Sequence, residues 1–152
     1  MNVLLEFLLR KNDNLTGEWR DMEQTTKFRL DMKQINNLCT GVKLAVELKS
    51  EEDKLRKFLT VQGYRYNADG QVIRLEKVLN RPDFLDTIYF EVRCYELSVD
   101  YYTNNWDVTE DDLASEVYLD DIKGIKALEI VLSDYIQDYS VLRPEWECDN
   151  LL

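Results

Sequence analysis

Residues 88–101 constrain the fold more than any other part of the chain, because their apolar side chains recur at every second position. The even-numbered residues from Ile88 to Cys94 are apolar, whereas from Tyr95 onward the apolar residues are odd-numbered. A period of two is typical of a β-strand, and a slip of one residue in that period requires an extra residue. The pattern predicts one long bent strand or two strands, with a β-bulge or a tight break at residues 94–96.

Three further segments alternate in the same way and are predicted to be strands. They span residues 3–9, 28–32 and 42–48. The first is apolar on both faces, which is typical of a central strand, and residues 34–41 are expected to connect the other two. A hairpin is predicted at residues 64–75, because Asn67-Ala68-Asp69-Gly70 lies between two short extended segments and supplies a glycine for the left-handed position of the turn.

Helices are predicted from capping residues and from apolar spacings of three and four. Ser50 precedes three acidic residues and would begin a helix that Gly63 ends. Thr109 would begin a short helix in the same manner, which Leu113 and Val117 would continue. A longer helix is predicted over residues 125–139, beginning at Asp120 or Asp121.

The order of these elements predicts an α+β fold: a single domain over residues 1–152, with a mostly antiparallel sheet and helices packed on it. Residues 76–85 are expected to form an irregular link or a short helix. Regular structure is expected to end at Arg143-Pro144, which leaves residues 143–152 as a short acidic C-terminal tail. No apolar run approaches the roughly 20 residues that span a bilayer, and three widely separated cysteines indicate reduced thiols in the cytoplasm.

The residue types that most enzymes need are missing. The chain contains no histidine, which removes the commonest general base and the commonest metal ligand. Its five glycines are isolated and cannot form a phosphate-binding loop, and its cysteines lack the short spacing of zinc sites. The acidic run 107–112 lacks the glycine and the final glutamate of a calcium loop. The sequence therefore predicts a protein that is not an enzyme and has no metal and no cofactor.

The distribution of charge is the strongest functional signal. Residues 94–152 contain 15 acidic and three basic residues, whereas residues 1–93 contain 15 and 16. The segment 95–122 contains nine carboxylates and no Lys or Arg, interleaved with Tyr and Trp, which are favoured anchors at protein interfaces. Such a surface attracts basic partners and repels nucleic acid, although a solvated acidic face that only maintains solubility explains the same residues. The predicted partner-binding residues are Trp106, Asp107, Glu110, Asp111, Asp112, Glu116, Tyr118, Asp120 and Asp121.

A small, acidic, histidine-free α+β chain with this cluster of carboxylates and aromatic residues resembles the immunity proteins of bacterial polymorphic-toxin and contact-dependent growth inhibition systems. These proteins neutralise nuclease toxins by binding them. The resemblance implies a basic protein partner, with carboxylates where substrate phosphates would lie and with Trp106 and Tyr118 as apolar anchors. The negative charge of the chain predicts no direct binding of nucleic acid or of a membrane. Two alternatives stay open: a phage-type nucleic-acid mimic, such as an anti-restriction or anti-CRISPR protein, and a structural subunit that forms a homo-oligomer through its strand edges.

Overall fold

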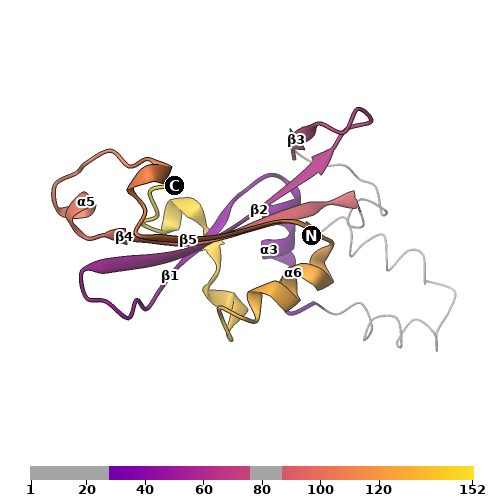
Figure 1. The fold of residues 1–152 in the computed structure, drawn as a ribbon. Helices are drawn as coiled ribbons and strands as arrows, with labels where there is room; N and C mark the ends of the chain where they lie inside the picture. The colour runs from indigo at the N-terminus through magenta and orange to yellow at the C-terminus, as the bar shows by residue number, and fades with distance from the viewer. Residues whose placement is uncertain (1–27, 76–86) are drawn as a thin grey trace, which may run out of the picture.

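The computed structural model describes residues 28–75 and 87–152, and within them the chain is an α+β domain built on one antiparallel sheet (Figure 1). The strands are β1 (Leu44–Leu48), β2 (Leu55–Tyr66), β3 (Val72–Arg74), β4 (Tyr89–Ser98), β5 (Ser115–Lys123) and β6 (Arg143–Pro144). The helices are α3 (Met32–Cys39), α5 (Asp100–Thr103) and α6 (Ile125–Leu132), with 3-10 turns η1 (Glu110–Asp112), η2 (Tyr139–Val141) and η3 (Glu145–Glu147). The predicted fold class is confirmed. The predicted strand 3–9 and the predicted link 76–85 lie outside the described residues.

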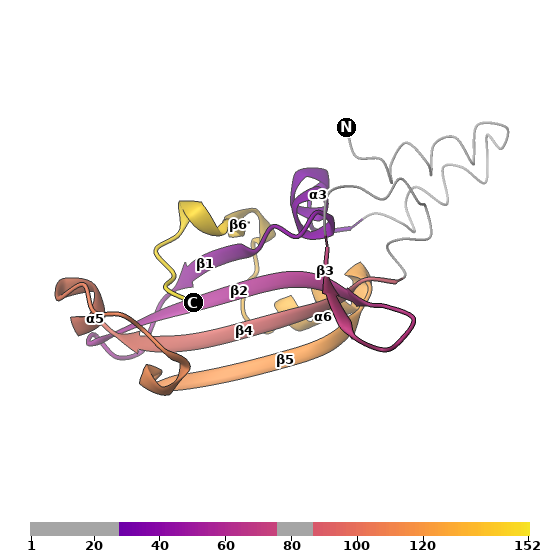
Figure 2. The ribbon, with the colours of Figure 1, turned by 90° about the horizontal axis from the view of Figure 1, so that it is seen from above.

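The sheet has β2 and β4 at its centre and β5 at one edge. Its order is β5-β4-β2-β1-β6, and β3 pairs separately with β2. The pairing of β2 with β4 is unbroken from Leu55 opposite Ser98 to Tyr64 opposite Tyr89. Figure 2 shows β1, β2, β4 and β5 side by side, with β5 outermost. None of the described helices is both long enough and apolar enough to cross a membrane.

The two faces of the sheet are covered by different layers, and both faces are buried at Phe58 and Leu59. On one face, α3 and α6 pack over a buried cluster that includes Leu59, Val92 and Cys94 (Figure 1). On the other face, Phe58 and Tyr95 are fully buried, and the ring of Tyr102 from the α5 segment stacks on Phe58 at 6.0 Å between centroids. None of the described helices covers the rest of this second face, toward β3.

This arrangement explains why the apolar period slips between Cys94 and Tyr95. Their side chains point to opposite faces of β4, and each face is buried at that position by a different layer. The pairing with β2 continues through both residues without an extra residue, so the predicted bulge or break at 94–96 is wrong. The slip in the apolar period marks the point in β4 where the buried side chains change from one face of the sheet to the other.

A register shift does occur in the sheet, but in β5. The partner of Phe90 is Ile122, and the partner of Val92 is Leu119. The strand β5 therefore carries an extra residue opposite Glu91, and Asp121 adopts a positive φ of 54° at this point. This bulge turns the carboxylate of Asp121 toward the second face.

Three assignments in the first half of the chain are wrong. Residues 28–32 are not a strand and residues 34–41 are not a connection, because α3 occupies Met32–Cys39. Asp31 caps this helix in a capping box with Gln34, and Ile35 and Leu38 are fully buried. The helix predicted from Ser50 is also absent, because Leu55–Tyr66 is the longest strand. The apolar residues of this strand also fit a helical spacing, because adjacent residues are buried on opposite faces of a central strand.

The second half of the chain follows the predictions more closely. Thr109 does cap a helical segment, but only the single turn Glu110–Asp112, and the residues after it form β5. The long helix begins after Gly124, not at Asp120 or Asp121, which lie in β5, and it ends at Leu132, short of the predicted residue 139. The hairpin at residues 64–75 is confirmed, with Gly70 at φ 77°. Regular structure continues past residue 143, since β6 pairs with β1 and η3 follows it.

Gly63 sits where α3 approaches the sheet most closely. An added Cβ at this position would lie 2.9 Å from the carbonyl oxygen of Leu38 and 2.9 Å from Cδ1 of Leu75. Glycine is required here for close packing, which is a different role from the helix terminator that the sequence indicated.

Candidate functional site

All nine predicted binding residues lie along one border of the molecule. Five of them occupy the loop between α5 and β5: Trp106, Asp107, Glu110, Asp111 and Asp112. The other four lie on the outermost strand β5: Glu116, Tyr118, Asp120 and Asp121. We call residues 106–121 the acidic edge. The structure therefore brings the predicted residues onto one continuous border, because the loop after α5 leads directly into β5.

The strand β5 is an exposed sheet edge. Among the described residues it pairs only with β4, and eight of its nine residues are exposed. Val117 and Leu119 lie opposite Cys94 and Val92 and remain 47% and 38% exposed. An edge with free backbone groups and exposed apolar side chains is a ready site for pairing with another chain.

Several acidic-edge carboxylates also stabilise the local fold. Asp112 accepts hydrogen bonds from the amide of Thr109 at 2.7 Å and from the hydroxyl of Tyr101 at 3.0 Å, and these bonds lower its pKa. Arg93 forms ion pairs with Glu110 at 3.1 Å and with Glu116 at 3.5 Å. These carboxylates are already partly compensated within the protein.

Three carboxylates of the acidic edge are different. The side chains of Asp107, Asp111 and Asp120 are exposed and form no hydrogen bond or ion pair with a described residue. Trp106 is 54% exposed, and its ring contacts that of Tyr101 edge-on at 5.5 Å. These residues present uncompensated charge and an apolar surface to solvent.

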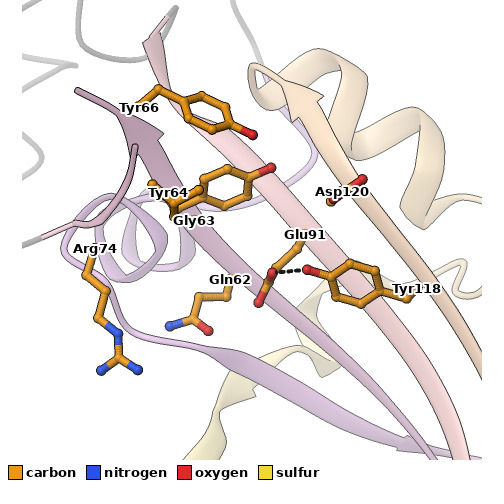
Figure 3. Close-up of a pocket in the computed structure, with 9 residues that line it drawn as sticks. Gln62, Gly63, Tyr64, Tyr66, Arg74, Glu91, Tyr118 and Asp120 are labelled. Carbon is orange, nitrogen blue, oxygen red and sulfur yellow. Dashed lines mark hydrogen bonds between the residues drawn. The ribbon is translucent and has the colours of Figure 1, made fainter. Parts of the chain in front are cut away.

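A groove that the sequence did not indicate lies on the second face of the sheet, next to the acidic edge. We call it the tyrosine groove; it has a volume of about 290 Å³. Figure 3 shows Tyr64 and Tyr66 of β2 on one side, Tyr118 and Asp120 of β5 on the other, and Glu91 of β4 between them. With Val72 and Arg74 of β3, four strands contribute to the groove, and two of its residues belong to the acidic edge.

The hydroxyl groups of the tyrosine groove donate to carboxylates. Tyr64 donates to Oδ1 of Asp121 at 2.6 Å, and Tyr66 donates to the same oxygen. Tyr118 donates to Oε2 of Glu91 at 2.5 Å. Burial and the Asp121 carboxylate raise the pKa of Tyr64, while the hydrogen bond to Glu91 and burial raise the pKa of Tyr118. The hydroxyls therefore stay protonated beside ionised carboxylates.

The rings of the groove form a cluster with Tyr89, the neighbour of Tyr64 in β4. Tyr64 and Tyr89 stack at 6.0 Å between centroids, and Tyr66 meets Tyr89 edge-on at 5.1 Å. The alternation of Tyr64 and Tyr66 within the hairpin is the one signal in the sequence that points to this cluster. It could not be used without knowing that β2 pairs with β4.

No protein-family model matches the chain, and no curated protein or solved structure is significantly similar to it. Within residues 28–75 and 87–152, no group of three or more Cys, Asp or Glu side chains is arranged to hold a metal ion. The chemistry that the site does offer is recognition: exposed negative charge, an open strand edge and an aromatic groove on adjoining surfaces.

Proposed function

We propose that this protein is a binding protein without enzymatic activity, which captures a basic protein partner along the acidic edge. The observation that carries this proposal is that an exposed edge strand and the loop before it contain no Lys or Arg between residues 95 and 122, and that Asp107, Asp111 and Asp120 form no ion pair with a described residue. Charged side chains and the bulge at Asp121 protect this strand edge against unspecific pairing, but folding alone does not require that the charges from residue 95 to residue 122 all be negative.

The physical basis of capture is complementarity in both charge and backbone pairing. The carboxylates would attract a basic partner from a distance and raise its association rate by about 10- to 1,000-fold at low salt. The open edge of β5 and the exposed side chains of Val117 and Leu119 would then supply short-range contacts. Steering and anchoring would therefore act on the same border of the molecule.

The finer proposal is that the partner is a nuclease-type toxin and that the protein is a cytoplasmic immunity protein. A nuclease binds phosphates in a basic cleft, so the carboxylates of Asp107, Asp111 and Asp120 would occupy the places of substrate phosphates. The resemblance in general character described above supports this proposal. Nucleic-acid mimicry against a restriction or CRISPR nuclease uses the same chemistry and is the alternative within the binding class.

A homo-oligomer formed through β5 is a second candidate, which the exposed strand edge favours. Charge opposes it, because pairing two copies of β5 would bring Glu116 and Asp120 of one copy close to the same residues of the other. Sizing at low and high salt tests this candidate. Dimerisation that persists at low salt would favour the subunit over the binding protein.

The proposal is tested with the variant Asp107→Lys/Asp111→Lys, which reverses two exposed carboxylates and leaves the groove and the Asp112 cap intact. The matched control is Glu51→Lys/Asp53→Lys, which makes the same charge change in the exposed turn before β2. The probes are a panel of inactivated basic nuclease toxin domains, with polylysine as a nonspecific polycation. We expect one toxin domain to bind far more tightly than polylysine and the acidic-edge variant to bind it at least tenfold more weakly than the control. Equal binding by both variants, or uniform binding of every polycation, would refute the proposal.

A further inference from the structure

The tyrosine groove is a concave site that adjoins the acidic edge. Its tyrosine hydroxyls and carboxylates can accept hydrogen bonds from a ligand. Tyr118 and Asp120 belong to both surfaces, so a chain lying along β5 would pass the mouth of the groove. A volume of about 290 Å³ lies at the lower limit of small-molecule pockets, which span about 300–1,000 Å³, and it accommodates one large side chain.

The tyrosine hydroxyls and carboxylates of the groove offer hydrogen-bond acceptors, and the side-chain donors of its lining belong to Gln62 and Arg74. The hydroxyl protons of Tyr64, Tyr66 and Tyr118 are all donated to carboxylates. Oδ2 of Asp121 accepts no hydrogen bond from a described residue, and the same is true of Oε1 of Glu91. A complementary ligand must therefore bring several N–H or O–H donors.

The charge of the groove selects a cation among donor-rich ligands. Glu91 and Asp120 line it, and Asp121 lies beside it behind the hydroxyls of Tyr64 and Tyr66. Arg74 is the one cation among its lining residues, and Figure 3 shows its guanidinium pointing away from the tyrosines. An anionic or neutral ligand would leave these carboxylates uncompensated at close range.

The aromatic rings select a flat cation. Guanidinium stacks on aromatic faces and carries five donors in a rigid plane, whereas ammonium is compact and strongly hydrated. The protein already uses this recognition once at the border of the groove. The guanidinium of Arg93 lies 5.3 Å from the centroid of the Tyr118 ring while it pairs with Glu110 and Glu116. One tyrosine ring and two carboxylates therefore hold a guanidinium beside a groove of the same composition.

We infer that the tyrosine groove is a socket for the guanidinium of an arginine side chain that projects from the captured basic partner. This inference rests on the proposed function, because it names the group through which the partner is anchored beside the acidic edge. Tyr118 would contribute its ring, and Glu91 and Asp120 would accept hydrogen bonds from the planar fork.

The test titrates the isotope-labelled protein with N-acetyl-arginine methylamide and follows backbone amide shifts by NMR. The citrulline derivative is the neutral match in shape, and the lysine derivative is the match in charge. We expect shifts at groove residues of β2, β4 and β5, with arginine binding at least fivefold more tightly than lysine and citrulline binding least. Equal binding of citrulline, or shifts confined to residues 106–112, would overturn the inference, as would tighter binding of free L-arginine, which would indicate a small-molecule site.

Two variants locate the socket. Glu91→Gln keeps the size of the side chain and an acceptor for the Tyr118 hydroxyl, and Tyr118→Leu removes the ring. Each is expected to weaken binding of the arginine derivative at least fivefold, whereas Asp53→Asn in the distant turn leaves it unchanged. A spectrum that otherwise matches the parent establishes that each variant is folded. Unaltered binding by Glu91→Gln would refute the inference.

The two proposals fail separately. If the arginine derivative does not bind but Asp107→Lys/Asp111→Lys still loses a toxin domain, the acidic edge captures its partner without the groove, and only the socket is refuted. If the arginine derivative binds but no basic protein is captured, the groove recognises guanidinium for another purpose, and the proposed function is refuted.

Discussion

Replacing Gly63 with alanine tests the packing on which the sheet depends. The new Cβ would lie 2.9 Å from the carbonyl oxygen of Leu38, 2.9 Å from Cδ1 of Leu75 and 3.4 Å from Cε1 of Phe90. The first of these atoms is backbone at the end of α3, so relief requires α3 to shift away from β2. Overpacking of this kind costs about 1–3 kcal/mol.

The sign of the effect separates two physical explanations. Alanine is more favourable than glycine inside a strand by about 0.5–1 kcal/mol, so strand propensity alone predicts a more stable protein. Close packing against Leu38 and Leu75 predicts a net loss of about 1–2 kcal/mol in the free energy of unfolding. For a chain of this size the loss corresponds to a decrease in Tm of about 2–8 °C.

The assay is urea unfolding followed by circular dichroism, with a thermal melt as a second measurement. Gly70→Asn is the control, because residue 70 has a positive φ that asparagine tolerates and no atom lies within 4 Å of an added Cβ. In the variant Gly63→Ala/Leu75→Val, the second change should cost less than it does alone, because it removes part of the clash. A Gly63→Ala protein as stable as the parent would refute the close approach of α3.

Three further predictions concern buried groups. The buried carboxylate of Glu129 accepts the backbone amides of Arg29 and Leu30, so Glu129→Ala should lower the free energy of unfolding by about 2–4 kcal/mol and Glu129→Gln by less, as measured in urea. Because the pKa of Tyr64 is raised in the folded state, stability from this group is fully present below about pH 10 and declines as the pH rises further; denaturant midpoints and phenolate absorbance across that range measure it, and no decline would contradict the prediction. Burial raises the pKa of the Cys39 thiol to about 12, so a thiol reagent at neutral pH should modify Cys39 at least tenfold more slowly in the folded protein than in urea.

The sequence predicted the fold class and the elements that depend on local signals. The hairpin turn at Asn67 to Gly70, the strand 42–48 and the cap at Thr109 follow from residues adjacent in the chain. Thr109 and Asp112, for example, satisfy each other across a single turn. Such signals need no knowledge of tertiary structure.

The wrong assignments arise where tertiary burial determines the pattern. Phe58 and Leu59 are adjacent and both fully buried, because β2 is covered on opposite faces at this point. A strand buried on both faces has no alternation, so its apolar residues also fit a helical spacing. Before α3, the alternation of Phe28 and Leu30 indicated a strand, and the capping box between Asp31 and Gln34 was therefore missed.

The candidate site divides in the same way. The acidic edge was predictable because its residues are contiguous in the sequence and lie on one arm of a hairpin. The tyrosine groove was not, because it brings Tyr64, Glu91 and Tyr118 together from three strands, and the longest of these was assigned to a helix. Its carboxylate Asp121 reaches Tyr64 only because β5 has a bulge at that residue.

Two layers cover the central strands β2 and β4: α3 and α6 lie on one face, and the α5 segment lies on the other. Each layer can open while the other stays packed. Opening of the α5 segment would expose Phe58 and Tyr95 to solvent, whereas the apolar cluster beneath α3 and α6 would stay buried. Amide hydrogen exchange would then separate into two protection groups whose opening free energies respond to different substitutions. No residue of a described helix lines the groove, so a ligand can enter it without displacing either layer.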